Sequence, residues 1–324
     1  MIKDLATAQE IYSRMNNSSN ILLITHKNPD GDGLGTLSAL AMYLKSLNKK
    51  FQLFCLDEVS KNFSFLPLMH EISNDQELFN KEKYDLVIVL DSGSLNYAGV
   101  DKLIENMDYT PYILNIDHHK TNDEFGNLNL VISSASSTSE IMYELFRLWK
   151  VTITKDMATS LLNGIIYDTG VFSNAGTTLG SLKAASHLLN LGARHREINE
   201  NFIRNKSLNL LKLWGIAFER LSYNPKYQIA YTVLTYKDFK KLGLEEVASE
   251  GLSNFFNELA GAKIALVLHE KEPGIIKGSL RTTHDDVDVA KLAKTWGGGG
   301  HQKAAGFTIS GTLVYNDNKW SINK

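Results

Sequence analysis

Four apolar runs of strand length constrain the fold more than any other feature of this sequence. They are NILLIT (20–25), FQLFCL (51–56), DLVIVL (85–90) and YILNI (112–116). Between the first two, LGTLSALAMYLKSL (34–47) carries apolar residues at helical spacing. Strands that are apolar throughout and alternate with helices are typical of a parallel sheet covered on both faces. The sequence therefore predicts an α/β fold with an N-terminal, doubly wound, mainly parallel sheet.

The remainder of the chain predicts a helical region and then a second, smaller α/β domain. A length of 324 residues also suits two domains better than one. We therefore expect an N-terminal domain over 1–194, a helical linker over 195–224 and a C-terminal domain over 225–324. The predicted helices are 136–149, 156–168, 181–193, one or two within 195–222, 252–260 and 288–296, and the predicted strands are 227–235, 263–270, 275–282 and a last one at 304–310.

Charge and cysteine content restrict the partners and the compartment. The formal net charge is −2, whereas proteins that grip long nucleic acids usually carry a strong basic excess. Any nucleic-acid partner should therefore be short, or be held locally by bound cations and a few basic side chains. The single cysteine, Cys55, excludes a disulfide framework and favours a reducing compartment.

The N-terminal residues 1–15 mix both charge signs and do not resemble a signal peptide. No stretch approaches the ~20 apolar residues that span a bilayer. We expect a cytoplasmic protein with no membrane partner. The sequence leaves the oligomeric state open, a homodimer included.

Acidic and imidazole side chains directly follow three of the apolar runs. The carboxyl ends of parallel strands meet at one edge of a sheet, where ligands bind. Crowded carboxylates repel one another, and divalent cations remove that cost by using them as ligands. The groups are His26, Asp30 and Asp32 after the first run, Asp91 after the third, and Asp117, His118 and His119 after the fourth.

This donor set predicts a site for two metal ions. Histidine with oxygen donors suits Mn²⁺ first, with Mg²⁺, Co²⁺, Fe²⁺ or Zn²⁺ as substitutes. The donors are too many for one ion, so we expect two, about 3.5–4 Å apart. The glycines of DGDGLG let the chain turn tightly, so that Asp30 and Asp32 can face different ions. Taken alone, each set of side chains has a simpler explanation: a turn, a helix cap or a surface histidine. These explanations do not account for the occurrence of all three sets at one edge of the sheet.

Six short motifs, read in order, resemble those of the DHH phosphoesterase family and its DHHA1 substrate-binding domain. The resemblance covers about residues 20–310 and implies a mixed sheet in the C-terminal domain and an active site in the cleft between the two domains. The motifs are HKNPDGDGLGT (26–36), LDSGS (90–94), DHHKTN (117–122) and YDTGVFSN (167–174), then SLRT (279–282) and GGGGHQKAAGF (297–307).

The resemblance also implies how the metal ligands divide. Asp168 would be taken for a helix end from its local sequence, and only the resemblance makes it a ligand. Asp91 is expected to bridge the two ions. The implied sets are His26, Asp30 and Asp91 for one ion, and Asp32, Asp91, His118 and Asp168 for the other.

Two side chains of the DHHKTN motif (117–122), His119 and Asp117, are expected to act in catalysis together with Asp91. The resemblance places His119 near the substrate phosphate, where its imidazole could stabilise charge in the transition state. The alternative is an exposed bystander. Asp117 is expected either to orient a histidine by hydrogen bonding or to cap a turn.

In the C-terminal domain, the resemblance implies substrate contacts. Arg281 lies on a predicted strand, and its planar guanidinium suits bidentate phosphate binding. The alternative is a solvated edge residue. Gly298, Gly299, Gly300 and His301 are expected to contact substrate, because glycine lets a backbone approach a phosphate or base closely. The alternative for the glycines is a flexible linker.

The chain most resembles the short bacterial members of the family, which degrade very short RNAs and dephosphorylate 3′-phosphoadenosine 5′-phosphate. We expect a dimetal phosphoesterase that acts on short RNA oligomers or on this nucleotide bisphosphate. The alternatives are a phosphodiesterase for cyclic or linear dinucleotides (c-di-AMP or pApA) and an exonuclease for short single-stranded DNA. The GGGGH segment counts against a pyrophosphatase. The intact ligand positions count against a nucleotide-binding module without catalysis.

Overall fold

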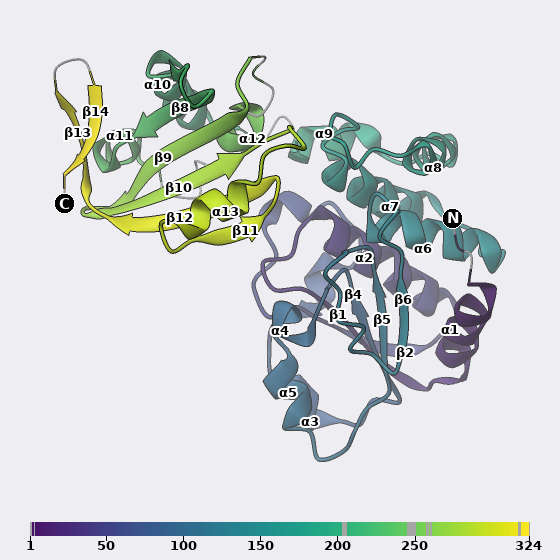
Figure 1. The fold of residues 1–324 in the computed structure, drawn as a ribbon. Helices are drawn as coiled ribbons and strands as arrows, with labels where there is room; N and C mark the ends of the chain where they lie inside the picture. Colours follow the sequence, from purple (N-terminus) through teal and green to yellow (C-terminus); the bar gives the residue numbers. More distant parts are fainter. Residues whose placement is uncertain are drawn as a thin grey trace. The chain divides into compact units, whose positions relative to one another are not determined.

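In the computed structural model the chain divides into two compact units, residues 1–205 and 206–324 (Figure 1). The structure describes residues 2, 4–202, 206–244, 251–256, 259, 261–316 and 319–323. The segment predicted as a linker, 195–224, is shared between the units, because it contains a helix of each. These helices are α9 (His195–Phe202) in the first unit and α10 (Leu208–Glu219) in the second.

The first unit is built on a six-stranded sheet with the order β3-β2-β1-β4-β5-β6. Every neighbouring pair in it is parallel. The four strands predicted from the apolar runs are confirmed as β1, β2, β4 and β5, and two short edge strands are added. The strands are β1 (Asn20–Thr25), β2 (Lys50–Phe54), β3 (Ile72–Ser73), β4 (Leu86–Leu90), β5 (Ile113–Asp117) and β6 (Leu128–Val131).

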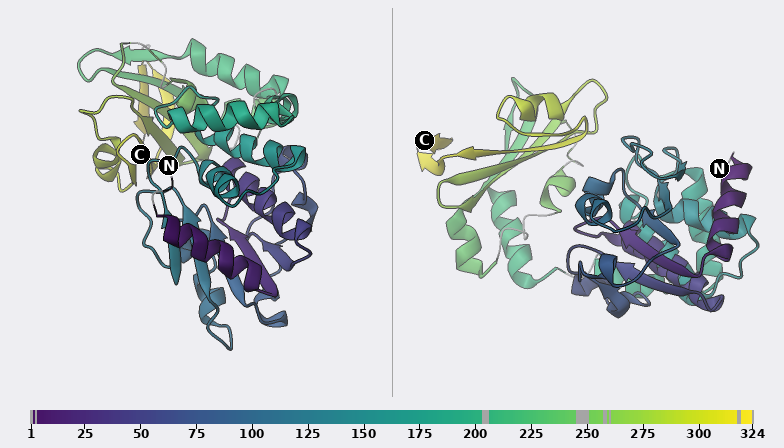
Figure 2. Two further views of the ribbon diagram at one scale, coloured as in Figure 1. Left: turned by 90° about the vertical axis from the view of Figure 1, so that its right-hand side faces the viewer. Right: turned by 90° about the horizontal axis from the view of Figure 1, so that it is seen from below.

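Helices cover both faces of this sheet (Figures 1 and 2). Alternate residues of one strand enter two different cores, since side chains alternate across a sheet. Ile21 and Leu23 pack in the larger core with α1, α2, α6, α7 and α8, whereas Leu22 and Ile24 pack in the other with α3 and α4. The helices are α1 (Leu5–Asn17), α2 (Gly31–Ser46), α3 (Leu78–Lys81), α4 (Leu95–Ala98), α5 (Asp101–Glu105), α6 (Thr138–Leu148), α7 (Lys155–Asp168) and α8 (Leu179–Asn190), with 3-10 turns at Lys61–Phe63 and Met69–Glu71.

The strand order reverses between β1 and β4, which are neighbours in the sheet although distant in sequence. Such a switch point leaves a crevice at the carboxyl ends of the strands, where ligands of doubly wound folds bind. The segments that follow β1, β4 and β5 therefore emerge side by side at this edge. They carry the predicted metal ligands.

The second unit holds a mixed six-stranded sheet with the order β11-β12-β10-β9-β8-β7. Strands β8 and β9 pair in parallel, and the other neighbours are antiparallel. The predicted mixed sheet is thus confirmed. The strands are β7 (Ser222–Asn224), β8 (Ile229–Leu234), β9 (Ile264–Glu272), β10 (Ile275–Arg281), β11 (Gly299–His301) and β12 (Ala304–Ser310), and the helices are α10, α11 (Tyr236–Leu242), α12 (Leu252–Phe256) and α13 (Val289–Lys294).

The expectation that 304–310 forms the last strand is wrong. A two-stranded sheet of β13 (Thr312–Asn316) and β14 (Lys319–Asn323) follows it. Leu313 of this hairpin packs with Val233 and Ile276 of the main sheet, so the hairpin extends the core of the second unit. The predicted helix 252–260 is present as α12, and residues 257, 258 and 260 of that prediction lie outside the described residues.

Over the described part of the chain, no helix combines the length and the apolarity that crossing a membrane requires.

Candidate metal centre

The structure brings the histidine and aspartate side chains at the carboxyl edge of the first sheet into three overlapping groups. Within each group, one nitrogen or oxygen donor per residue lies within 4.8 Å of the others. Asp91 and His118 each belong to two groups, so the groups form one continuous centre. They are His26, Asp30 and Asp91; Asp32, His118 and Asp168; and Asp91, His118 and His119.

The first group follows β1 and β4. The Nε2 atom of His26 lies 3.6 Å from Oδ1 of Asp30 and 3.6 Å from Oδ2 of Asp91. The other ring nitrogen, Nδ1, lies 2.8 Å from the carbonyl oxygen of Lys27. A proton on Nδ1 is donated to that carbonyl and leaves Nε2 free as a ligand, the arrangement that usually orients metal-binding histidines.

Asp30 also begins helix α2. Its Oδ1 accepts the backbone N–H groups of Asp32 (2.9 Å) and Gly33 (3.1 Å). The helix-cap alternative weighed for an aspartate after a strand therefore applies to Asp30. The cap occupies Oδ1 only, and the carboxylate keeps a second oxygen for a cation.

The second group is gathered from α2, the segment after β5 and the last residue of α7. The Nε2 atom of His118 lies 3.1 Å from Oδ2 of Asp168. Asp32 is fully buried. Helix α7 approaches Asp32 closely at Gly164, because a methyl group added there would lie 2.5 Å from Oδ1 of Asp32.

The start of helix α6 holds Asp32 in place. The backbone N–H of Thr138 donates to Oδ2 of Asp32 (2.6 Å), and that of Ser139 donates to Oδ1 (2.9 Å). These are unpaired N–H groups of a first helical turn, which favour an anion. The hydroxyl of Thr138 also donates to Oδ1 of Asp91 (2.8 Å). Thr138 therefore contacts both carboxylates, although they follow different strands.

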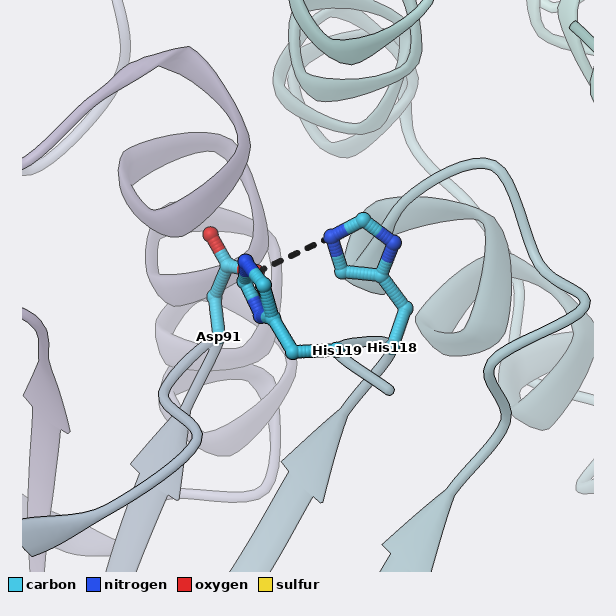
Figure 3. A group of neighbouring side chains, drawn as sticks. All are labelled: Asp91, His118 and His119. Carbon is cyan, nitrogen blue, oxygen red and sulfur yellow. Dashed lines mark ion pairs between the residues drawn. The ribbon is translucent and has the colours of Figure 1, made fainter. Parts of the chain in front are cut away.

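Asp91 lies between the two ligand groups. Its Oδ2 faces His26 as described above, and its Oδ1 lies 3.7 Å from Nε2 of His118 and 3.9 Å from Nδ1 of His119. Figure 3 shows both imidazoles of the next strand beside this carboxylate. The backbone of Asp91 is left-handed, with φ +56°. This region is disfavoured for most residues but tolerated by Asp and Asn, and such backbone strain concentrates at functional sites.

Asp117, the last residue of β5, contacts His119. Its Oδ1 lies 2.7 Å from Nδ1 of His119 and accepts the backbone N–H of His118 (2.8 Å). The Nδ2 group of Asn122 donates to Oδ2 (2.6 Å). Asp117 is fully buried, while the side chain of His119 is 38% exposed. This geometry fits the orienting role predicted for Asp117, and that role stays a prediction.

Without a cation, the electrostatics of the centre favour bound protons. Burial alone would lower the pKa of both histidines, but the neighbouring carboxylates outweigh it, raising the pKa of His26 to about 12 and that of His118 to about 10. Burial raises the pKa of Asp168 to about 6, and burial together with the charges of Asp91 and Asp168 raises that of Asp32. At Asp91 the histidines outweigh burial and lower the pKa to about 2. A divalent cation would displace these protons.

The donors present fit a pair of divalent cations. Carboxylate oxygens and imidazole nitrogens, without thiolates, suit Mn²⁺ and comparable ions. Buried carboxylates raise the free energy of the folded chain unless a counter-charge offsets them. Around Asp32, that counter-charge comes from His118 and from the backbone N–H groups at the start of helix α6. The chain's residues therefore meet the requirements of the predicted metal site.

The predicted substrate contacts belong to the second unit. Arg281 ends β10, and one of its Nη1–H groups donates to the carbonyl oxygen of Leu280 (3.0 Å). Gly299, Gly300 and His301 form β11, so this segment is a strand and not a flexible linker. The side chain of His301 lies outside the described residues. The roles of these residues as substrate contacts stay predictions.

Packing within the chain accounts for two of these glycines. A methyl group at Gly298 would overlap the carbonyl oxygen of Gly306, and one at Gly300, where φ is +140°, would overlap strand β12 at Ala304. Gly299 has open space at the same position. Among residues 298–300, Gly299 is thus the one whose identity its own packing does not require.

Sequence reasoning missed several residues of the centre. The sequence places Thr138 and Ser139 only at the start of a predicted helix, and it indicates no role for Asn122 or Tyr97. The run SSTS (136–139), four small hydroxyl residues close behind a strand, is a signal that could have indicated a polar site. Tyr97 carries no comparable signal in the sequence.

Comparison with known families agrees with this geometry. Residues 20–165 match the DHH family, N-terminal domain, and residues 226–319 match the DHHA1 domain. The chain therefore belongs to the DHH family, and it is a metal-dependent phosphoesterase, a hydrolase.

Three individual proteins are similar to this chain over 90% or more of its length. The chain is 28% identical over 291 residues to the bifunctional oligoribonuclease and PAP phosphatase NrnA of Thermus thermophilus, covering 90% of this chain and 84% of that one. An exopolyphosphatase-related protein from Bacteroides fragilis has the same fold, with a TM-score of 0.88, 23% identity and coverage of 96% and 94%. RecJ from Thermus thermophilus, solved in complex with Mn²⁺, matches with a TM-score of 0.53, 14% identity and coverage of 94% and 52%. A relative with this fold thus binds Mn²⁺.

Proposed function

We propose that this phosphoesterase hydrolyses short oligoribonucleotides to mononucleotides and removes the 3′-phosphate of 3′-phosphoadenosine 5′-phosphate. The observation that carries the proposal is the continuous centre in which Asp91 belongs to one group with His26 and Asp30 and to another with His118 and His119. The name of the Thermus thermophilus relative supports the substrate class. The net charge of −2 supports short substrates over long nucleic acid.

The chain's own residues divide into two ligand sets in this proposal. His26, Asp30 and Asp91 would hold one divalent ion. Asp32, His118 and Asp168, again with Asp91, would hold the other, and Mn²⁺ suits both sets best. Bound ions of this kind lower the pKa of a coordinated water and offset the charge that develops on phosphorus oxygens.

His119 has the geometry of a donor to the substrate phosphate. A proton on its Nδ1 is donated to Asp117, which Asn122 and the backbone of His118 fix in turn. In the metal-free centre burial lowers the pKa of His119, but Asp117 and Asp91 outweigh burial and raise it. The remaining Nε2–H is then free to donate to a phosphate oxygen.

In the same proposal the second unit selects the length of the substrate. Arg281 would bind a terminal phosphate through its guanidinium, and Gly299 would offer its backbone N–H to a phosphate or base. A preference for dinucleotides and short oligomers, and for a nucleotide with two phosphates, would follow from such an anchor.

Product analysis tests this proposal. Purified protein with Mn²⁺ is given end-labelled RNA oligomers of increasing length, the same oligomers as DNA, the bisphosphate, pApA and c-di-AMP. We expect rates to fall with RNA length and 3′-phosphate to be released from the bisphosphate. Faster turnover of c-di-AMP or of single-stranded DNA would overturn the substrate assignment while leaving the phosphoesterase class intact. Asp91→Asn serves as the inactive control.

A further inference from the structure

Tyr97 is a half-exposed aromatic residue beside the metal centre that the proposed mechanism does not use. Its ring lies nearly parallel to that of His26, with the centroids 5.2 Å apart and the planes at 24°. It is inclined by 60° to the ring of His119, at a centroid distance of 6.3 Å. A single tyrosine therefore contacts one predicted metal ligand and the predicted phosphate donor.

The backbone holds Tyr97 in this place firmly. Tyr97 lies in the short helix α4, whose first N–H groups are capped by Ser94, since the backbone N–H of Tyr97 donates to Oγ of Ser94 (3.0 Å). The hydroxyl of Ser92, the neighbour of Asp91, donates to the carbonyl oxygen of Ser94 (2.9 Å). Hydrogen bonds thus connect the position of Tyr97 to the end of β4 and the shared carboxylate.

The ring itself is not a core residue. Ala98 and Leu95 of the same helix pack in the core beneath α4, whereas Tyr97 is 46% exposed. Within the part of the chain that the structure describes, its hydroxyl has no hydrogen-bond partner. His26 does not depend on it for orientation, because the carbonyl of Lys27 already fixes Nδ1. A large aromatic surface is thereby left facing solvent next to the predicted reaction site.

We propose that Tyr97 is a platform on which a nucleobase of the substrate stacks beside the metal centre. The inference rests on the proposed function, because it assumes a nucleotide substrate. Stacking on an aromatic ring tolerates any base, since every base has a π-face. The ring would bind the nucleotide adjoining the scissile phosphate and would favour nucleotides over phosphoesters without a base.

The test compares dinucleotides with and without a base. Tyr97→Leu removes the aromatic ring, Tyr97→Gln is a second non-aromatic variant, and Tyr97→Phe is the matched control that keeps the ring. Each is assayed with Mn²⁺ on ApA and on the two analogues in which one base is replaced by hydrogen. We expect both non-aromatic variants to raise KM for ApA by about 5- to 150-fold, the range for one base stacked on an aromatic ring, with little change in kcat. Tyr97→Phe should match the wild type.

The analogues identify the stacked base. For the analogue that lacks it, wild type and Tyr97→Leu should have the same KM, so that the two changes are not additive. Equal additional losses on all three substrates would overturn the proposal. So would a lower Mn²⁺ affinity of Tyr97→Leu in calorimetry together with an unchanged KM, because Tyr97 would then act only through His26.

A binding measurement separates this inference from the proposed function. Fluorescence of 2-aminopurine riboside 5′-monophosphate should be quenched by the wild type and Tyr97→Phe but less by Tyr97→Leu. Quenching of this pattern in a protein that does not cleave RNA would refute the proposed function alone. RNA cleavage with identical quenching and KM in all variants would refute the stacking platform alone.

Discussion

Sequence motifs indicate two functional regions of the molecule, and the structure explains their residue types in different ways. The acidic centre comprises His26, Asp30, Asp32, Asp91, His118 and Asp168, and the glycine segment comprises residues 297–300. In the acidic centre, packing does not require the residue types, and burial disfavours the charge of Asp32 and Asp168. In the glycine segment, packing against β12 requires glycine at 298 and 300.

The difference teaches how far a motif is evidence for chemistry. Residues that are unfavourable for the fold and yet gathered at one point indicate a ligand that offsets their cost. Residues that the backbone needs are explained without one. Substitutions in the acidic centre should therefore lower activity and metal affinity, and substitutions in the glycine segment should first lower stability.

The variant Asp91→Asn is the strongest test of the expectation that substitutions in the acidic centre lower activity and metal affinity. Asparagine tolerates the left-handed backbone at this position, so we expect the chain to fold. Loss of the carboxylate that is proposed to hold both metal ions should lower kcat/KM by about a thousandfold or more, since bound metal ions contribute several kcal/mol to such reactions. Steady-state kinetics and Mn²⁺ calorimetry measure this. Asp108→Asn, a change at an exposed aspartate, is the control, and full activity of Asp91→Asn would contradict the shared role.

Thr138→Val tests whether helix α6 supports the acidic centre. The change keeps the shape of the side chain and removes the hydrogen bond to Oδ1 of Asp91. We expect the affinity for Mn²⁺ to fall about 10- to 100-fold, as is typical when a group that orients a metal ligand is lost. Thr138→Ser retains the hydroxyl and should bind Mn²⁺ as the wild type does. Equal affinities in all three proteins would show that the hydroxyl of Thr138 has no part in metal binding.

Gly298→Ala tests the explanation of the glycine segment. The added methyl group overlaps the carbonyl of Gly306, so we expect the free energy of unfolding of the second unit to fall by about 1–3 kcal/mol. Gly299→Ala, where the space is open, should stay within about 0.5 kcal/mol of the wild type. Urea unfolding followed by tryptophan fluorescence is suitable, because Trp214, Trp296 and Trp320 lie in this unit. A stable Gly298→Ala protein would refute the packing explanation.

Asp168→Asn should change stability with pH in a defined direction. Its pKa is raised from the ordinary 3.8 to about 6, so the ionised carboxylate opposes folding of the metal-free protein above that range. The free energy of unfolding of the variant, relative to that of the wild type, should therefore rise as pH increases from 3.8 to about 6, whereas loss of the contact with His118 lowers the stability of the variant throughout this range. Denaturation of both proteins in the presence of a metal chelator, at several pH values, measures this difference in stability. A stability difference that does not rise between pH 3.8 and about 6 would contradict the assignment.

The sequence predicted those features that local patterns determine. Strands β1 and β4 are continuous apolar runs, and the acids that follow them are brought together by the parallel topology alone. The hairpin β13–β14 was missed because each of its strands has only five residues, most of which are exposed, so no buried apolar run marks them. The contacts of Thr138 and Tyr97 could not be predicted, because they depend on how helices α6 and α4 lie against loops that are distant in sequence. Asp168 needed the family resemblance for the same reason.

The left-handed backbone of Asp91 limits how this site can be redesigned. Replacement by glutamate or cysteine, a usual means of retuning a metal preference, would place a residue that disfavours the left-handed region at a position where φ is +56°. Positions with ordinary backbone angles, such as His26 or Asp168, are the better starting points for engineering the selectivity of the centre. Asp91 should then be kept unchanged while the other ligands are varied.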